Sequence, residues 1–347
     1  MIPASGYHLV GRVGNMSVEE RGATLAVVRV EPPLCRRLER LSTHLGCAPL
    51  DAFDSVDELA ARPEWPEVIL FDAERVGADT ARLFDCRVDS HLTPIVALVP
   101  SVESSLAQAC AEAGAHEVFS YDQVGVALAH RLRSLLEARA LLVSIRNGID
   151  PGTLPRHVRA LAAAAEVVED RTGGHTARVA CLSANIAVRL GESRHLVERV
   201  RLAALLHDVG KLAVPSMILK KPARLSHWEF AVVQRHTTEG AAMLGEPVTE
   251  ELMIARTIAE THHERWDGAG YPNGLAGDAI PLEGRIVAVA DVFDALTSDR
   301  AYKPAWHIGD ALAEIERGAG TQFDAQAVEA LISVSKEPGF RWAAAAR

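Results

Sequence analysis

The sequence predicts two folded parts: an α/β domain over 23–125 with a parallel sheet, and an all-α domain over 153–340. Up to about residue 125, short apolar runs rich in β-branched residues alternate with helical patterns, which is typical of βαβ units. Beyond that point, the apolar residues follow a helical period almost throughout. The length of 347 residues suits two domains of roughly 100–200 residues each.

The amino-acid composition argues against several classes of protein. Apolar residues make up 48%, too many for a disordered chain, and the net charge of −10 argues against a protein with a basic nucleic-acid-binding surface. The five cysteines are scattered without a CxxC pair, which favours a reducing compartment, so we expect a cytoplasmic protein. The chain contains no apolar run long enough for membrane insertion, and its first residues do not read as a signal peptide.

The elements of the α/β domain follow from period and turn residues. After an N-terminal extension over 1–22, four buried strands are predicted at 24–30, 67–72, 93–99 and 116–120. Helices are predicted at 33–46 and 101–113. A long helix is predicted over 124–145. It forms most of a helical linker, taken as 126–152, and the Gly and Pro residues of 147–152 interrupt the helical pattern there.

Histidines and aspartates lie on helix faces of the second domain that otherwise carry apolar residues. They are His175, His207, Asp208, His236, His262, His263 and Asp291. His175, for example, shares a helical stripe with Val179 and Ile186, a face that turns to the core. A buried unpaired charge is very costly, and no arginine is evident near the carboxylates. One such histidine alone is better explained as an ordinary core or surface residue, but the set together favours divalent cations.

The adjacent pair His262 and His263 needs a special backbone position. On a regular helix the two side chains diverge by roughly 100°. They can reach one site only near a helix end or between two ions. Gly268 and Gly270 follow closely and favour a helix end at this point.

Three motifs closely resemble the HD-GYP family of the HD phosphohydrolase superfamily. They are HDVGK at 207–211, HHERWDGAGYP at 262–272 and ADVFDALTSDR at 290–300, and the resemblance covers about 165–335. It implies a helical domain with a metal cluster that hydrolyses cyclic di-GMP, mainly to linear pGpG, by water activated between two ions. It also implies two divalent ions, with iron or manganese favoured and zinc, nickel or magnesium as alternatives.

The resemblance assigns roles residue by residue. His175, His207, Asp208 and Asp291 would bind one metal, and Asp208 would bridge to a second metal held by His236, His262 and His263. Asp208 and Lys211 would be catalytic; the weaker alternative for Lys211 is a solvated helix-end lysine that neutralises backbone carbonyls. The substrate would be bound by Lys211, Tyr271, Asp294, Arg300 and Lys303.

One position departs from the family pattern. Where some members place a Glu ligand for a third metal, four residues before the first histidine, this chain has Arg171. A cation cannot ligate a cation, so two metals are expected, and release of pGpG rather than GMP.

Residues 23–140 resemble a response-regulator receiver domain, with Asp72 at the phosphoacceptor position. Arg29 and Val30 replace the acids that would bind Mg²⁺, and Val99 and Tyr121 replace the hydroxyl and the lysine. We therefore expect a pseudo-receiver that is not phosphorylated, in which Asp72 is a relic paired with Arg29. Homodimerisation through this domain or the linker helix, or binding of regulatory proteins, is its expected role.

Three functions compete on the sequence. The intact ligand set favours an active cyclic di-GMP phosphodiesterase. The alternatives are a non-catalytic sensor of the nucleotide and a phosphohydrolase of another cyclic dinucleotide. No residue in the sequence identifies the leaving-group acid.

Overall fold

The protein is described from a computed structural model that covers residues 12–13, 16–17, 23–85, 92–168, 174–299, 304–338 and 340. By internal contacts the chain forms two compact units. The first consists of 1–149 and 212–219, and the second of 150–211 and 220–347. The domain boundaries expected from the sequence, with a linker at 126–152, stay predictions.

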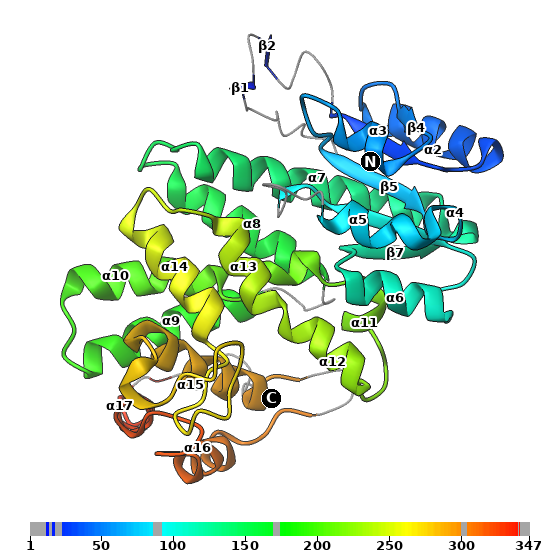
Figure 1. The fold of residues 1–347 in the computed structure, drawn as a ribbon. Coiled ribbons are helices and arrows are strands. Elements are labelled where there is room, and N and C mark those ends of the chain that lie inside the picture. Colours follow the sequence, from blue (N-terminus) through cyan, green and yellow to red (C-terminus); the bar gives the residue numbers. More distant parts are fainter. Residues whose placement is uncertain are drawn as a thin grey trace, which may run out of the picture. The chain divides into compact units, whose positions relative to one another are not determined.

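A parallel five-stranded sheet forms the core of the first unit (Figure 1). Its strands are β3 (Leu25–Val28), β4 (Asp51–Phe53), β5 (Val68–Asp72), β6 (Ile95–Val99) and β7 (Glu117–Ser120). They lie in the order β4-β3-β5-β6-β7, a doubly wound topology in which functional groups gather at the carboxyl ends of the strands. This confirms the predicted α/β class.

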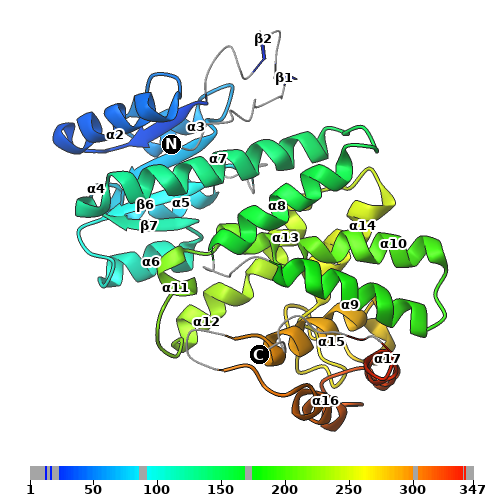
Figure 2. The same cartoon turned by 180° about the vertical axis from the view of Figure 1, so that it is seen from behind.

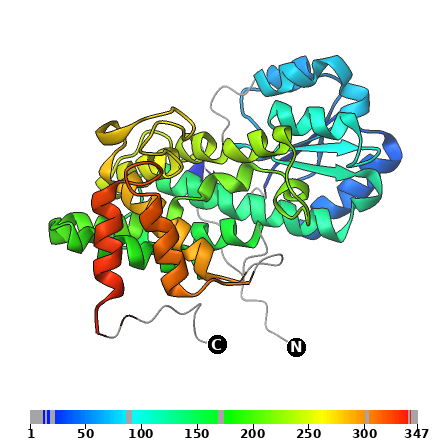
Figure 3. The same cartoon turned by 90° about the horizontal axis from the view of Figure 1, so that it is seen from below.

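Helices cover both faces of this sheet (Figure 3). They are α2 (Pro32–Leu45), α3 (Val56–Ala60), α4 (Ala73–Val76), α5 (Thr80–Asp85), α6 (Ser105–Ala113) and α7 (Val126–Arg146). On one face, Val27 and Leu70 pack with Leu38 of α2 and Leu132 of α7. On the other, Phe71 meets Phe84 of α5 edge to face, with ring centroids 6.1 Å apart. Burial on both faces explains the nearly continuous apolar runs of the strands.

Several short elements of this unit were not predicted, namely the helices α3, α4 and α5 and the strands β1, β2 and β4. The edge strand β4 spans three residues that are not fully buried, so it carries no apolar run. Within the N-terminal extension, β1 (Arg12–Val13) pairs antiparallel with β2 (Met16–Ser17). Both strands are too short for a periodic signal.

The first unit also includes the segment 212–219, which contains α11 (Ser216–Leu219). A buried ion pair holds this segment: Arg131 Nε lies 2.8 Å from the Glu117 carboxylate. Arg131 donates to the carbonyl of Leu212, and the backbone amide of Ser216 donates to Glu117. The charges of Glu117 and Arg131 thus have partners inside the fold.

The second unit is built from helices, as the sequence predicts. They are α8 (Leu154–Val168), α9 (His175–Arg189), α10 (Arg194–Ala203), α12 (His227–Gln234), α13 (His236–Leu244), α14 (Glu250–Thr261), α15 (Leu282–Thr297), α16 (Ile308–Arg317) and α17 (Ala325–Ser335). Helix α9 contacts both α10 and α15 (Figure 2). The stripe of Val179, Leu182 and Ile186 on α9 is fully buried, as expected. Among the described residues, no helix has the length and apolar character needed to cross a bilayer.

Candidate metal centre

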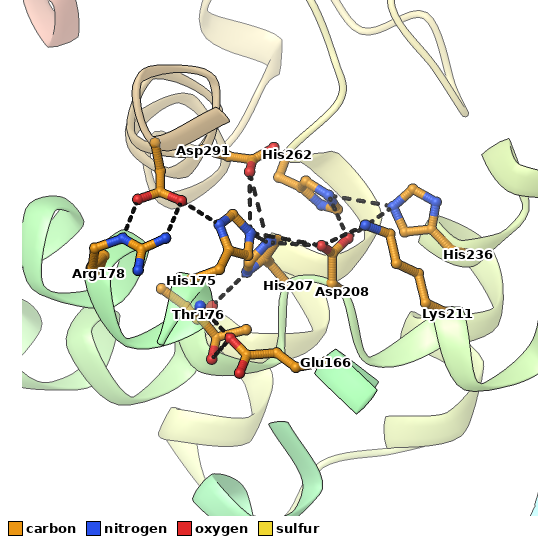
Figure 4. A network of polar contacts seen from close by, with 12 residues as sticks. Glu166, His175, Thr176, Arg178, His207, Asp208, Lys211, His236, His262 and Asp291 are labelled. Atoms are coloured by element: carbon orange, nitrogen blue, oxygen red, sulfur yellow. Dashed lines mark hydrogen bonds and ion pairs between the residues drawn. The ribbon is translucent and has the colours of Figure 1, made fainter. Parts of the chain in front are cut away.

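The site lies where the ends of several helices of the second unit meet (Figure 4). His175 is the first residue of α9, and Asp291 lies in α15. His207 and Asp208 lie in a turn between two short 3₁₀ segments that follow α10. Helix α14 ends at Thr261, so His262 and His263 follow it directly. This confirms the helix end that the adjacent pair requires.

Glu166 fixes the start of α9 and therefore the position of His175. Its carboxylate accepts hydrogen bonds from the backbone amides of Gly174 and Thr176, at 3.2 and 2.7 Å, and from the Thr176 hydroxyl at 2.9 Å. These amides lie at the start of the helix, where backbone N–H groups have no acceptor within the helix. A carboxylate at this end also interacts favourably with the helix dipole. Glu166 was not predicted, because no spacing rule links it to the motif.

Gly210 allows Asp208 to approach α13. A Cβ at this position would lie 1.9 Å from the carbonyl oxygen of His236, so any larger residue would push the two backbones apart. The close approach places the Asp208 Oδ1 atom 3.5 Å from His236 Nε2.

Asp208 lies between two groups of ligand atoms. Its Oδ2 atom is 3.1 Å from His207 Nε2 and 4.0 Å from His175 Nε2, and Asp291 Oδ1 is 3.4 Å from that same His175 atom. Its Oδ1 atom is 3.5 Å from His236 Nε2 and 3.8 Å from His262 Nε2. Ligand atoms of Asp208, His236, His262 and His263 all lie within 4.8 Å of one another, as do those of His175, His207 and Asp208.

Four imidazoles are oriented by hydrogen bonds at Nδ1. His207 donates to the carbonyl of Ala204 at 2.8 Å, His236 to Val233 at 2.7 Å and His262 to Ile258 at 2.9 Å. His175 Nδ1 lies 2.6 Å from Asp294 Oδ2. A proton on Nδ1 leaves the Nε2 lone pair available, which is the usual arrangement of a metal-binding histidine.

The Nε2 atoms face each other in pairs. His175 and His207 are 3.3 Å apart at these atoms, and His236 and His262 are 3.4 Å apart. Two lone pairs repel at this distance unless a proton or a metal ion lies between them. Burial and the neighbouring His207 and His236 lower the pKa of His262 to about 3, so protonation is unfavourable there. Two nitrogens bound to one ion at about 2.1 Å lie roughly 3.0 Å apart at a right angle and roughly 3.4 Å apart at a tetrahedral angle, so each pair is spaced closely enough to share an ion.

The protonation states of the side chains also favour bound metal ions. Burial raises the pKa of Asp208, but Lys211 and His207 outweigh it and hold that pKa well below its ordinary value. Asp208 is therefore ionised, while His262 is neutral, and these are the forms that bind metal. The donor set fits two divalent cations that share Asp208.

Asp294 contacts protein groups and not the open side of the site. Its side chain is 1% exposed and accepts from His175 Nδ1, from Arg178 Nε at 2.5 Å and Nη2 at 3.0 Å, and from the Ser298 hydroxyl at 3.3 Å. Burial would raise the pKa of Asp294, but His175 and Arg178 lower it to about 2. The expectation that no arginine lies near the buried carboxylates was wrong for Asp294. Arg178 lies one helical turn after His175, a spacing that could have indicated a shared face.

Lys211 forms an ion pair with Asp208. Its ammonium group donates to Asp208 Oδ2 at 2.7 Å, and the residue is 8% exposed. The alternative of a solvated helix-end lysine is therefore wrong, while the substrate and catalytic roles stay predictions.

The glycine-rich loop after His263 is fastened to the site by backbone hydrogen bonds. Glu264, which is buried, accepts from the backbone amides of Asn273 and Leu275 at 2.8 and 3.1 Å. A Cβ on Gly270 would lie 2.3 Å from the backbone nitrogen of Arg265, so the loop can close only with glycine there. The Tyr271 ring stacks on His263, with centroids 4.9 Å apart and an interplanar angle of 29°. Arg300, Lys303 and Arg171 lie outside the described residues.

The phosphoacceptor position of the receiver-like unit is blocked by protein contacts. Asp72 is 2% exposed and accepts from the Tyr121 hydroxyl at 2.8 Å, and Arg75 Nε lies 3.6 Å from its carboxylate. Burial and Asp72 raise the pKa of Tyr121, so the hydroxyl keeps its proton. Arg29 pairs instead with Asp79 at 3.0 Å, so the expected pairing of Arg29 with Asp72 was wrong.

Known proteins resemble the helical unit. Residues 159–327 match a family model described as an HD domain. The cyclic di-GMP phosphodiesterase response regulator RpfG of Xanthomonas campestris is 44% identical over 180 residues, 51% of this chain and 48% of that protein. A cyclic di-GMP phosphodiesterase of Thermotoga maritima is 45% identical over 166 residues, 48% of this chain and 45% of that protein. A 3'3'-cGAMP-specific phosphodiesterase 2 of Vibrio cholerae is 42% identical over 172 residues, 50% of this chain and 33% of that protein.

The fold and the His–Asp centre define the helical unit as an HD domain. Within that class, the motifs at 207–211, 262–272 and 290–300 and the similarity to the named cyclic di-GMP phosphodiesterases support the HD-GYP family, and a receiver-like unit precedes the helical unit. The chain spans half or less of the length of these curated relatives.

Proposed function

We propose that the protein is a cytoplasmic, metal-dependent phosphodiesterase that opens cyclic di-GMP, mainly to linear pGpG. The observation that carries this proposal is the position of Asp208, whose two carboxylate oxygens face two different groups of imidazoles. Relatives named as cyclic di-GMP phosphodiesterases, 44% and 45% identical over the matched residues, support the choice of substrate.

The ligand set would hold two ions, iron or manganese by preference because imidazole and carboxylate are mixed. When bound, two divalent ions lower the pKa of water and stabilise the attacking and leaving oxygens of a phosphodiester. His175, His207 and Asp291 would hold one ion, and His236, His262 and His263 the other. Asp208 would bind both, and its ionised carboxylate is prepared for this by Lys211.

Within the described residues, Lys211 carries the positive charge closest to Asp208, at 2.7 Å. Once the carboxylate binds metal, the ammonium group is placed to neutralise a phosphate oxygen beside the cluster. Tyr271, on the glycine-rich loop, would contact the nucleotide. Arg300 and Lys303 would bind its phosphates, for which a guanidinium fork and an ammonium group are suited.

A second substrate has specific support. The 3'3'-cGAMP-specific phosphodiesterase of Vibrio cholerae is 42% identical over the matched residues, nearly as similar as the cyclic di-GMP enzymes. Both substrates share the phosphodiester ring and one guanine. A non-catalytic sensor is disfavoured, because none of the seven predicted metal ligands is replaced. We also propose that the receiver-like unit mediates homodimerisation or binds regulatory proteins.

Initial rates on both cyclic dinucleotides test the proposal. Manganese-loaded protein is incubated with each substrate in separate reactions, and the products are separated by chromatography. We expect faster conversion of cyclic di-GMP, no turnover by Asp208→Ala, and normal turnover by the control Asp310→Ala on the exposed surface of α16. Faster conversion of 3'3'-cGAMP would reassign the substrate, and no turnover of either compound by protein with two bound metals would refute the enzyme.

A further inference from the structure

A row of aromatic rings leads away from the metal centre. It begins with His263, on which Tyr271 stacks, and continues to Phe230 of α12, which meets Tyr271 edge to face at a centroid distance of 6.2 Å and an angle of 81°. Helix α12 leads almost directly into α13 (Figure 1), and Phe230 precedes the ligand His236 by six residues. At 1.5 Å per residue this corresponds to roughly 9 Å along a helix.

Phe230 is 47% exposed. Single exposed apolar residues are common, so exposure alone indicates nothing. Phe230 differs from the other large apolar side chains exposed in the described part of the chain, because it alone is aromatic and contacts Tyr271 of the glycine-rich loop after His263. The others are Val126, Val167, Val188, Val248 and Met253.

Side-chain contacts anchor the helical turn that carries Phe230. Its neighbour Glu229 is buried and accepts from the Lys221 ammonium group, at 2.7 Å to each carboxylate oxygen, and from the backbone amide of Ser226 at 2.7 Å. The Ser226 hydroxyl in turn accepts from the amide of Glu229, which completes a capping box at the first turn. A side chain on such an anchored turn loses little entropy when a ligand packs on it.

We propose that Phe230, together with Tyr271, binds one nucleobase of the substrate by stacking and so favours nucleotide rings over smaller phosphodiesters. This inference rests on the proposed cyclic dinucleotide phosphodiesterase activity. With the scissile phosphate at the metal centre, one base extends through its ribose along the row of rings. A phenyl ring offers no hydrogen bond, so Phe230 contributes binding of a purine face and leaves the choice between guanine and adenine to other groups.

Because stacking is made in both the ground state and the transition state, its loss raises KM and leaves kcat unchanged. For Phe230→Ala we expect KM for cyclic di-GMP to rise about tenfold. Phe230→Tyr should keep KM within about twofold, and Phe230→Leu, which is apolar without a ring, should resemble the alanine variant. Met253→Ala, which removes an equally exposed apolar side chain from α14, is the matched control and should leave KM unchanged.

The metal content and hydrolysis of bis(p-nitrophenyl) phosphate at saturation show whether each variant keeps an intact centre. A KM for Phe230→Ala equal to that of the wild type, or full function of Phe230→Leu, would overturn the stacking role while leaving the proposed activity in place. Absence of cyclic dinucleotide turnover by wild-type protein that still hydrolyses bis(p-nitrophenyl) phosphate would overturn both. A loss of kcat with unchanged KM would show that Phe230 supports the centre structurally and would also overturn the proposal.

Discussion

Replacing Asp294 by asparagine separates two roles for this residue. The sequence predicts that Asp294 binds substrate, whereas its contacts indicate that it orients His175 for metal binding. Asp294 Oδ2 lies 2.6 Å from His175 Nδ1, and Arg178 bonds both carboxylate oxygens. An asparagine has one acceptor oxygen, so its amide NH₂ group must face either the Nδ1–H of His175 or the guanidinium of Arg178.

The magnitude follows from the bonds that are lost. Outer partners of metal-bound histidines typically contribute 10- to 100-fold in metal affinity, which corresponds to about 1.4–2.7 kcal/mol. A hydrogen bond to a charged group contributes about 1.5–3 kcal/mol to stability. The Arg178 side chain is 26% exposed and can turn to water, so we expect a loss of about 2 kcal/mol in unfolding free energy.

The assay is metal content after equilibration at a series of free Mn²⁺ concentrations, together with a denaturant titration. Asp294→Asn should bind the ion of the His175 group at least about tenfold more weakly and leave the ion of the His236 group nearly unchanged. Ser298→Ala removes a 3.3 Å hydrogen bond to the same carboxylate and a 3.1 Å hydrogen bond from Arg178 Nη2, but it leaves the contact of Asp294 with His175 in place and should cost much less metal affinity. Wild-type affinity for both ions in Asp294→Asn, with only KM for the substrate raised, would refute the positioning role.

The other predictions concern the bridge, the pseudo-receiver and the product. Asp208→Ala should abolish turnover and release most of the bound metal. Full activity together with full metal content in this variant would contradict the hypothesis that Asp208 bridges two ions. Acetyl phosphate should not phosphorylate Asp72, since Tyr121 and Arg75 occupy its carboxylate, and a substantial phosphorylated fraction by mass spectrometry would disprove this. Time-resolved chromatography should show pGpG accumulating, because Arg171 replaces the Glu that would hold a third ion; rapid stoichiometric GMP would show that Arg171 does not limit the second cleavage.

The repeating parts of the fold were predictable from sequence. Four strands of the sheet are buried apolar runs, so each carries its own signal, whereas β4 is short, partly exposed and depends on its pairing with β3. Helix period likewise placed His175 on a buried face, because Val179 and Ile186 share its stripe.

The contacts around the metal ligands were harder to predict from the sequence. Arg178 and Asp294 are 116 residues apart, and only the packing of α9 on α15 brings them together. The role of Gly210 depends in the same way on the backbone of α13, which no local pattern reveals. The ligand assignments, including the bridging position of Asp208, came from the resemblance, while the three-dimensional arrangement adds which carboxylate oxygen faces which imidazoles.

Anomalous diffraction from crystals of the manganese-loaded protein tests the central claim most directly, namely two ions that share Asp208. We predict two anomalous peaks, one on each side of the Asp208 carboxylate. One peak should contact His175, His207 and Asp291, and the other His236, His262 and His263. A single peak, or two peaks of which only one contacts Asp208, would contradict the account.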